Sequence, residues 1–441
     1  MPADSLRRGS SLGKTLDFMF RRFASASAVF ALAFHFSVSP SPAADRPTAF
    51  KFDFGTAQAA PGYTPVPPDA AYSKQRGWGF EPGAKISAID RGDDALLGDF
   101  CTSDRPFLFS VDLPEGNYTV TVVLGDAAGT STNTIKAESR RLMLENVVTA
   151  RGKFSTNSFT VNIRTPEIAG GGAVKLKPRE NDYLHWDDKL TLEFNGARPC
   201  LAALEITPAP NAVTVYLAGD STVTDQPREP WNSWGQMLPR FFQHGVAVAN
   251  HAESGESFKS SIGAHRFDKI FSTINSGDYL FMQFGHNDMK DKSPDALASY
   301  RASLERFVDQ ARKAGATPVL VTSMERKGGV EGNTLAGYPQ TVRDVAREKN
   351  AVLIDLHTMS KVFYQALGPD LGKAFQDGTH HNNYGSYELA KCVVEGIKAN
   401  KLSLAKFLAD VPPFDPAHPD PVDKFIMPPS QQRDTTKPDG N

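Results

Sequence analysis

Four short polar blocks in the second half of the chain carry residue types that could perform acyl transfer. In chain order they are Gly219-Asp220-Ser221, Asn250 to Gly255, Gly285 to Asp288, and Asp377 to His380. A serine hydroxyl is a poor nucleophile near neutral pH, so it needs a histidine base, and that base needs an orienting carboxylate. The D-x-x-H spacing lets the carboxylate reach Nδ1 of the histidine, which leaves Nε2 to take the serine proton. We therefore predict Ser221 as nucleophile, His380 as base and Asp377 as orienting group, with His381 as the rival base.

Acyl transfer also creates a tetrahedral oxyanion, which needs hydrogen-bond donors that are already in place, each worth about 10²- to 10³-fold in kcat. The candidate donors are the main-chain N–H of Ser221, the main-chain N–H of Gly255 and the side-chain amide of Asn287. Gly255 suits this task because the lack of a Cβ lets main chain approach a substrate closely. Taken singly, Gly255 also fits a plain loop glycine and Asn287 an ordinary turn.

Each block stands at the end of an expected strand or before the last expected helix. Apolar, strand-like runs occur at 213–217, 246–249, 278–284, 317–322 and 352–354. Helical periodicity occurs between them and after them, near 234–243, 266–273, 295–314, 335–349, 360–367 and 384–400. Strands that alternate with helices predict βαβ units and a parallel five-stranded sheet covered on both faces. The carboxyl ends of such strands build ligand sites.

The first half of the chain has a different period. Apolar and polar residues alternate over 49–54, 107–113, 118–124, 158–163, 189–194 and 201–206, with turn formers between these runs. The pattern predicts an antiparallel β-sandwich of about 160 residues. Loop aromatics could stack on sugars or pack over the sandwich ends; they are Tyr63, Tyr72, Trp78, Phe80 and Trp186. Asp90, Asp93 and Asp94 could hold calcium, although solvated loop charge explains them as well.

The N-terminus is typical of a targeting segment. Arg21 and Arg22 precede an apolar run and a small-residue stretch that ends at Ala44, so we expect a signal peptide over 1–44 and a secreted or periplasmic protein. Translation from Met19 instead of Met1 would give a complete signal sequence on its own. The expected domains are then the sandwich over 45–208, the α/β domain over 209–410, and a Pro-rich polar tail over 411–441 that is extended on the surface or disordered.

Composition narrows the classes of partner. The chain has 441 residues and a formal net charge of −2, and no stripe of Lys and Arg interleaved with aromatics, which argues against nucleic acid and against an anionic membrane. Cys101 and Cys200 could form a disulfide in an oxidising compartment, whereas Cys392 fits a helical apolar face. The cysteine spacing gives no metal pattern, and the predicted serine mechanism needs neither a metal nor an organic cofactor, so we expect none. The oligomeric state is not predicted.

The order and spacing of the four blocks resemble the SGNH, or GDSL-like, hydrolase family, whose flavodoxin-like three-layer α/β/α fold carries Ser, Gly, Asn and His in four such blocks. The family spacing favours His380 over His381. Thr222, the stretch Trp234-Gly-Gln-Met-Leu-Pro239 and the Asp377 to His381 block resemble the rhamnogalacturonan acetylesterase branch. The FDFG, LPEGNYTVTVVLGD and LTLEFNG stretches of the first half resemble a galactose-binding-like or malectin-like jelly roll.

These resemblances imply a serine esterase that removes acetyl groups from pectic polysaccharide, with an appended sugar-binding type of sandwich; the targeting segment adds that it is secreted. Residues near the blocks are then expected at a rim that contacts sugar: Trp231, Trp234, His286 and Arg326. An acetylxylan esterase or a short-chain lipid or aryl esterase of the same fold is the alternative. A carbohydrate-binding protein with an inactive hydrolase domain is an alternative of another class.

Overall fold

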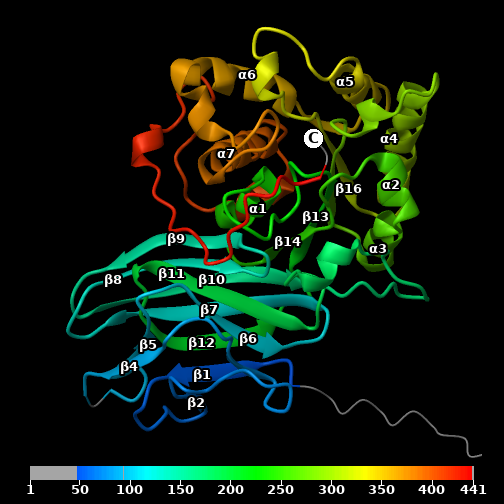
Figure 1. Cartoon of the computed structure of the whole chain (residues 1–441). Coiled ribbons are helices and arrows are strands. Elements are labelled where there is room, and N and C mark those ends of the chain that lie inside the picture. Colours follow the sequence, from blue (N-terminus) through cyan, green and yellow to red (C-terminus); the bar gives the residue numbers. More distant parts are fainter. Residues whose placement is uncertain (1–46, 93, 440–441) are drawn as a thin grey trace, which may run out of the picture. The chain divides into compact units, whose positions relative to one another are not determined.

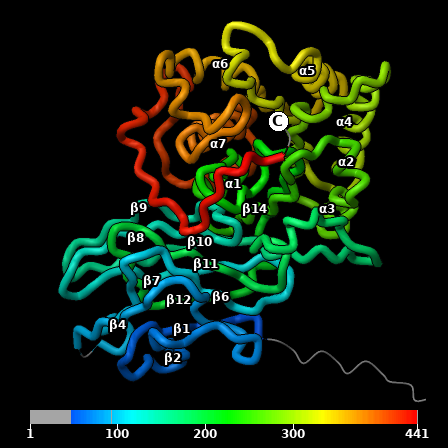
Figure 2. Tube along the Cα trace, in the orientation of Figure 1, coloured from blue at the N-terminus to red at the C-terminus, as the bar shows by residue number. Residues whose placement is uncertain are grey.

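The computed structural model describes residues 47–92 and 94–439. The predicted targeting segment over 1–44, the alternative start at Met19, and Asp93 of the acidic cluster lie outside these residues. Within them the chain forms three β-sheets, two in the first half and one in the second. Figure 1 follows the chain through these sheets, and Figure 2 gives the same path as a tube.

Two mainly antiparallel sheets make up the first half, as the alternation predicts. The strands of the first sheet are, in spatial order, β10 (Lys153–Ile163), β7 (Gly116–Asp126), β12 (Leu201–Pro208), β1 (Phe50–Phe54) and β2 (Thr64–Val66), with β5 (Asp99–Thr102) joined to β12 and β4 (Ser87–Asp90) joined to β5. Those of the second sheet are β3 (Trp78–Phe80), β6 (Phe107–Asp112), β11 (Lys189–Arg198), β8 (Ser131–Ala137) and β9 (Arg141–Thr149). Only the short β1–β2 pair in them is parallel.

Strand β7 shows why this sequence packs as a sandwich. Tyr118, Val120 and Val122 are buried, while the intervening Thr119 and Thr121 are partly exposed. Because side chains in a strand alternate between faces, one face of β7 joins the apolar core and the other does not. The core between the two sheets is completed by apolar residues that include Phe52, Phe109, Leu192 and Phe194.

A five-stranded, all-parallel sheet organises the second half. Its spatial order is β14 (Val246–Asn250), β13 (Val213–Gly219), β15 (Tyr279–Gln283), β16 (Thr317–Val321) and β17 (Val352–Ile354). On β13, Val215 and Leu217 enter one apolar core, whereas Tyr216 and Ala218 enter the other. The sheet is therefore buried on both faces, which is why its strands are nearly continuous apolar runs in the sequence.

Helices cover both faces of this sheet (Figure 1). The core on one face is closed by α1 (Trp234–Met237), α6 (Leu356–Leu367) and α7 (Asn383–Ala399). The core on the other face is closed by α2 (Phe258–Gly263), α3 (Arg266–Thr273), α4 (Ala296–Lys313) and α5 (Tyr338–Glu348). The predicted α/β/α layering is confirmed. In the described residues, no helix is both long and apolar enough to cross a bilayer.

The two halves share interior contacts. Leu142 of β9 is fully buried in a core of the second half. Its neighbour Arg141 donates from Nη1 to the carbonyl oxygen of Val248 (3.2 Å) and pairs through Nε with Asp225 (2.9 Å). Residues of the β-sandwich therefore contribute buried apolar and polar contacts to the interior of the second half.

The segment that follows α7 is irregular, as its composition predicts, but it makes specific contacts. Its only helical turns in the described residues are η6 (Ser403–Phe407) and η7 (Val422–Lys424). Glu229 N donates to the carbonyl oxygen of Gln432 (2.9 Å), and Asp434 N donates to that of Glu229 (2.8 Å). Residues 433–439, which we call the tail segment, run back along the second half; the last stretch of the chain is drawn red in Figures 1 and 2.

The three cysteines and two of the aromatic residues predicted in the sandwich loops pack in the interior or against it. Cys101 and Cys200 are separate, buried thiols, so the disulfide is not formed, and Cys392 lies in the core as expected. Phe80 is part of the sandwich core, and Trp78 packs against Phe52 at a centroid distance of 5.2 Å. For these two rings, packing explains the sequence pattern.

Candidate active site

All four predicted blocks meet at the carboxyl edge of the parallel sheet. Ser221 follows β13, Gly255 lies in the loop after β14, and Asn287 lies in the loop after β15. Asp377 and His380 come from the loop between η5 (Gly368–Ala374) and α7. Parallel strands end at the same edge of a sheet, so residues far apart in sequence converge there.

Ser221, His380 and Asp377 form one chain of contacts. Ser221 Oγ lies 2.8 Å from His380 Nε2, and His380 Nδ1 lies 2.8 Å from Asp377 Oδ2. A carboxylate can only accept, so Nδ1 carries the proton and Nε2 is left to accept from the serine hydroxyl. Both Ser221 and His380 are almost completely buried. The arrangement has the nucleophile, base and orienting group that acyl transfer requires.

Asp377 is held as a carboxylate. Burial alone would raise its pKa, but the hydrogen bond and charge of His380, with main-chain donors, hold that pKa well below its ordinary value. Those donors are the N–H groups of Thr379 (2.7 Å) and His380 (2.6 Å), which bond to Oδ1. The second carboxylate oxygen is thereby left for the imidazole.

The rival base, His381, is turned into the core. Its Nε2 lies 2.8 Å from the hydroxyl of Tyr364, and its ring packs against Phe375 with a centroid distance of 4.1 Å. Burial, with the neighbouring His380, lowers the pKa of His381 to about 3. A neutral histidine with its ring nitrogen engaged inside the protein has no access to the proton of Ser221.

The three predicted oxyanion donors lie in the loops that follow β13, β14 and β15. In the described residues, the N–H groups of Ser221 and Gly255 have no acceptor inside the protein. Asn287 donates one hydrogen of Nδ2 to the carbonyl oxygen of Glu256 (2.9 Å) and accepts from Lys290 at Oδ1 (3.0 Å). This fixes the amide orientation and leaves its second hydrogen for another acceptor. Gly255 has a φ of 81°, in the left-handed region that favours glycine.

Buried contacts of Asp220 and His286 stabilise the turn that carries Ser221. Asp220 Oδ1 accepts from the N–H (2.9 Å) and the hydroxyl (2.7 Å) of Thr222, and Oδ2 lies 3.3 Å from His286 Nδ1. Burial would raise the pKa of Asp220, but the charge of His286 and these hydrogen bonds lower it. The motif residue Asp220 is thus an interior brace for the turn that presents Ser221.

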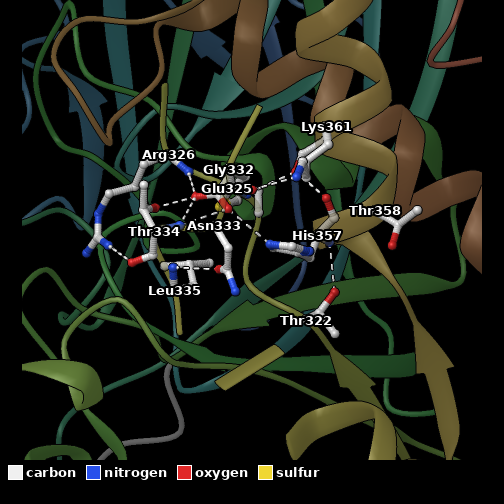
Figure 3. A network of polar contacts seen from close by, with 12 residues as sticks. Thr322, Glu325, Arg326, Gly332, Asn333, Thr334, Leu335, His357, Thr358 and Lys361 are labelled. Atoms are coloured by element: carbon white, nitrogen blue, oxygen red, sulfur yellow. Dashed lines mark hydrogen bonds and ion pairs between the residues drawn. The ribbon is translucent and has the colours of Figure 1, made fainter. Parts of the chain in front are cut away.

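A second polar network is centred on Glu325, and its residues are shown in Figure 3. Through Arg326 it bonds to the loop that carries Asp377 and His380. At its centre, buried Glu325 accepts from Arg326 N (2.7 Å) and from the hydroxyl of Thr334, and lies 3.2 Å from His357 Nε2. Burial would raise the pKa of Glu325, but these hydrogen bonds lower it to about 2. Arg326, fixed in this way, donates to the hydroxyl of Thr379 (3.2 Å) and to the carbonyl oxygen of His286 (3.1 Å).

The four residues predicted at a sugar-binding rim occupy different places. Trp231 packs edge-on against His380, with a centroid distance of 5.7 Å, and is 7% exposed. Trp234 and His286 are interior: Trp234 Nε1 donates to Gln283 (2.7 Å), and His286 Nε2 lies 3.1 Å from the carbonyl oxygen of Met324. This burial differs from the predicted rim position, because both side chains satisfy their polar atoms inside the protein. Arg326 is partly exposed, and its side chain donates to the hydroxyl of Thr379 and to the carbonyl oxygens of Thr334 and His286.

Sequence reasoning missed two contributors to the edge of the site. One is Arg179 in η1 (Pro178–Asp182), which comes from the first half of the chain and pairs with buried Glu253 (2.6 Å). The other is the tail segment, where Lys437 Nζ lies 3.8 Å from Asp377 Oδ2. A lone arginine in a loop and a polar Pro-rich tail carry no motif, so the sequence offered no signal for either. Among the described residues, no cluster of His, Cys, Asp or Glu is arranged to hold a metal ion.

Two models of known families match separate parts of the chain. The model of the GDSL-like lipase/acylhydrolase family matches residues 217–386. The model described as β-agarase/YXIM esterase-like, galactose-binding domain-like, matches residues 50–168.

Three curated relatives are all from Bacillus subtilis. The rhamnogalacturonan acetylesterase RhgT is 38% identical over 219 residues, which cover 44% of this chain and 94% of that protein. The probable rhamnogalacturonan acetylesterase YesY is 33% identical over 207 residues, which cover 44% and 95% of the two chains. The uncharacterized esterase YxiM is 27% identical over 376 residues and so spans both halves, covering 80% of this chain and 92% of that protein.

Proposed function

Because this chain belongs to the GDSL-like lipase/acylhydrolase family and is a serine esterase, we propose that it removes O-acetyl groups from a plant cell-wall polysaccharide, rhamnogalacturonan in the first place. The observation that supports this most directly is the contact chain from Ser221 through His380 to Asp377. Two relatives, one named as a rhamnogalacturonan acetylesterase and one as a probable one, match this chain over nearly their whole length.

The proposed reaction follows from the geometry. Ser221 Oγ attacks the acetyl carbonyl carbon while His380 Nε2 takes the hydroxyl proton, and Asp377 stabilises the imidazolium that forms. The oxyanion accepts from the N–H groups of Ser221 and Gly255 and from Asn287. Collapse breaks the bond to the sugar oxygen, which leaves with the proton from His380. Water, deprotonated by the same histidine, then hydrolyses the acetyl-serine, so that acetate is released and Ser221 regains its proton.

The reaction scheme needs no group besides the side chains and main-chain N–H groups of the protein and one water molecule. The low pKa of Asp377 keeps the orienting group ionised at the pH values where the histidine must be neutral to act as a base. The N-terminal targeting pattern further supports the proposal that the enzyme works outside the cytoplasm, where its polymer substrate would be found.

The decisive experiment compares acetate release by the protein and by its Ser221→Ala variant. The substrates are acetylated rhamnogalacturonan, acetylated xylan and a triglyceride emulsion, tested side by side. We expect release from rhamnogalacturonan that disappears in the variant. A preference for xylan or for the emulsion would retain the mechanism and reject the substrate. No release from any substrate would reject the enzyme proposal and favour a binding protein.

A further inference from the structure

One nitrogen of Arg179 points away from the protein core to a carboxylate of the tail segment. Arg179 Nε (3.0 Å) and Nη2 (2.6 Å) both donate to Glu253 Oε1, and Nη2 also donates to the carbonyl oxygen of Ser254 (2.9 Å). These bonds fix the plane of the guanidinium. Its remaining nitrogen, Nη1, pairs with the carboxylate of Asp439. Arg179 Nη1 is therefore a donor held in a fixed position, and in this structure it already binds a carboxylate.

This carboxylate adjoins a predicted oxyanion donor. A Cβ placed on Gly255 would lie 3.0 Å from Cβ of Asp439 and 3.5 Å from Nζ of Lys177. Asp439 thus occupies the space directly beside Gly255. The ammonium group of Lys177 lies next to the same space and is a second cation there. An anionic group bound here would be close to the ester that Ser221 attacks, on the same or a neighbouring sugar residue.

The surrounding charges allow an added carboxylate. Lys177 pairs with Glu256 (2.9 Å), Arg179 with Glu253, and Arg266 with Glu180 (2.6 Å), so cations and carboxylates match in number before Asp439 is counted. Burial, together with the nearby charge of Glu180, raises the pKa of Glu253 to about 7. Because this shift weakens the negative charge that faces Arg179, an incoming anion can pair with the guanidinium.

The tail segment is attached across the approach to this site by a few bonds. Asp434 accepts from Trp231 Nε1 at its carbonyl oxygen (3.0 Å) and pairs with Arg228 (2.9 Å). A pocket of about 210 Å³ lies between this segment and the protein, with Arg179, Trp231, Ser254 and Asp439 in its wall. Asp439 therefore lies beside Gly255 in the wall of the space that a bound sugar could enter.

We propose that Arg179, with Lys177 beside it, binds the carboxylate of a uronate residue of the substrate, and that Asp439 occupies this subsite when substrate is absent. The inference rests on the proposed function and sharpens it. A uronate offers the same chemical group as Asp439, whereas a neutral acetylated xylan offers none. The first half of the chain then selects for an acidic polysaccharide by contributing a residue to the substrate cleft.

The test compares Arg179→Gln, Asp439→Asn and a control, Arg228→Gln, with the unaltered protein. Arg228 is matched to Arg179 because it too pairs with a tail aspartate, but it has no bond to the 253–255 loop. KM and kcat are measured on acetylated rhamnogalacturonan oligosaccharides, acetylated xylo-oligosaccharides and p-nitrophenyl acetate. For Arg179→Gln we expect KM on the uronate substrate to rise at least tenfold more than KM on either neutral substrate. Asp439→Asn lowers KM on the uronate substrate, and Arg228→Gln does not raise it.

Inhibition gives a second readout that does not depend on the polymer being a substrate. Unacetylated galacturonate oligomers are expected to inhibit hydrolysis of p-nitrophenyl acetate competitively in the unaltered protein and at least tenfold more weakly in Arg179→Gln. An equal loss of kcat on all three substrates would overturn the proposal, since Arg179 would then only support the Glu253 loop. An unchanged KM and unchanged inhibition would overturn it as well. If the protein cleaves p-nitrophenyl acetate but neither polymer, the proposed function fails while the inhibition still decides the subsite.

Discussion

Arg326 Nε donates to the hydroxyl of Thr379 at 3.2 Å, and Thr379 immediately precedes the proposed base, His380. The main-chain N–H of Lys327 adds a bond to the carbonyl oxygen of Gly378 (3.0 Å). Together they attach the Glu325 network to the loop that carries Asp377 and His380. Arg326 therefore has a positioning role that can be separated from sugar binding.

Arg326→Met is expected to lower kcat about ten- to a hundredfold on acetylated oligosaccharides and on p-nitrophenyl acetate alike, because misplacement of the base affects every ester. Lys327→Met is the matched control, since the Lys327 side chain is exposed and its main-chain bond is retained. Steady-state kinetics on both substrates decide the question. A rise of KM on the oligosaccharide alone would show that Arg326 contacts sugar instead.

Asp377→Asn tests the orienting carboxylate. An amide placed opposite His380 Nδ1 can donate, which favours the tautomer that carries its proton on Nε2 and so removes the acceptor for Ser221. We expect kcat to fall by about 10³- to 10⁴-fold with little change in KM. The control is Asp370→Asn, at an exposed carboxylate of η5 that pairs with Lys373. A loss smaller than tenfold would mean that Asp377 does not set the tautomer.

The parts of the fold that could be predicted are those where local sequence decides burial. Strand β13 lies between two apolar layers, so the continuous run from Val213 to Ala218 indicates it directly. The blocks that follow such strands converge because parallel strands end at one edge. The sequence could therefore predict that Ser221, His380 and Asp377 lie together, and the contacts among them agree.

Strands β8 and β9 were not predicted, because they bury charges whose partners lie far along the chain. Lys136 of β8 is 3.4 Å from Glu193, and Arg141 of β9 is 2.9 Å from Asp225. Such residues resemble loop composition until the opposite charge is known. The same holds for Arg179, whose carboxylate partners Glu253 and Asp439 come from the second half.

Asp288 offers a test of a buried carboxyl group through its pH dependence. Burial raises the pKa of Asp288 to about 7 from the ordinary value of 3.8, although Oδ1 accepts from Phe258 N (2.9 Å). As the pH rises from about 4 to about 7, the unfolded chain loses this proton before the folded protein does, so the group's contribution to stability falls over that range. Above pH 7 both states are ionised and the loss is complete.

The difference in unfolding free energy, Asp288→Asn minus the unaltered protein, should therefore increase by about 2 to 4 kcal/mol between pH 4 and pH 7. Above pH 7 the difference should stay constant. Asparagine retains the acceptor for Phe258 and carries no proton to lose. Urea unfolding at a series of pH values measures the difference, and Asp291→Asn, at an exposed neighbour, serves as control. A difference that does not change with pH would show that Asp288 titrates normally.

Leu142 tests whether the β-sandwich and the parallel-sheet half unfold together. Its side chain is fully buried in a core of the second half although β9 belongs to a sheet of the first half. Leu142→Ala should therefore cost about 2 to 5 kcal/mol of unfolding free energy and shift the transitions of both halves to lower denaturant. Val148→Ala is the control, because Val148 lies on the same strand and is 63% exposed, so its truncation should change stability by less than about 0.5 kcal/mol. Far-UV circular dichroism and residual esterase activity are followed in the same urea series. We expect one coincident transition, which moves to lower urea in Leu142→Ala. Two separate transitions, of which only one is displaced, would mean that the halves are energetically independent.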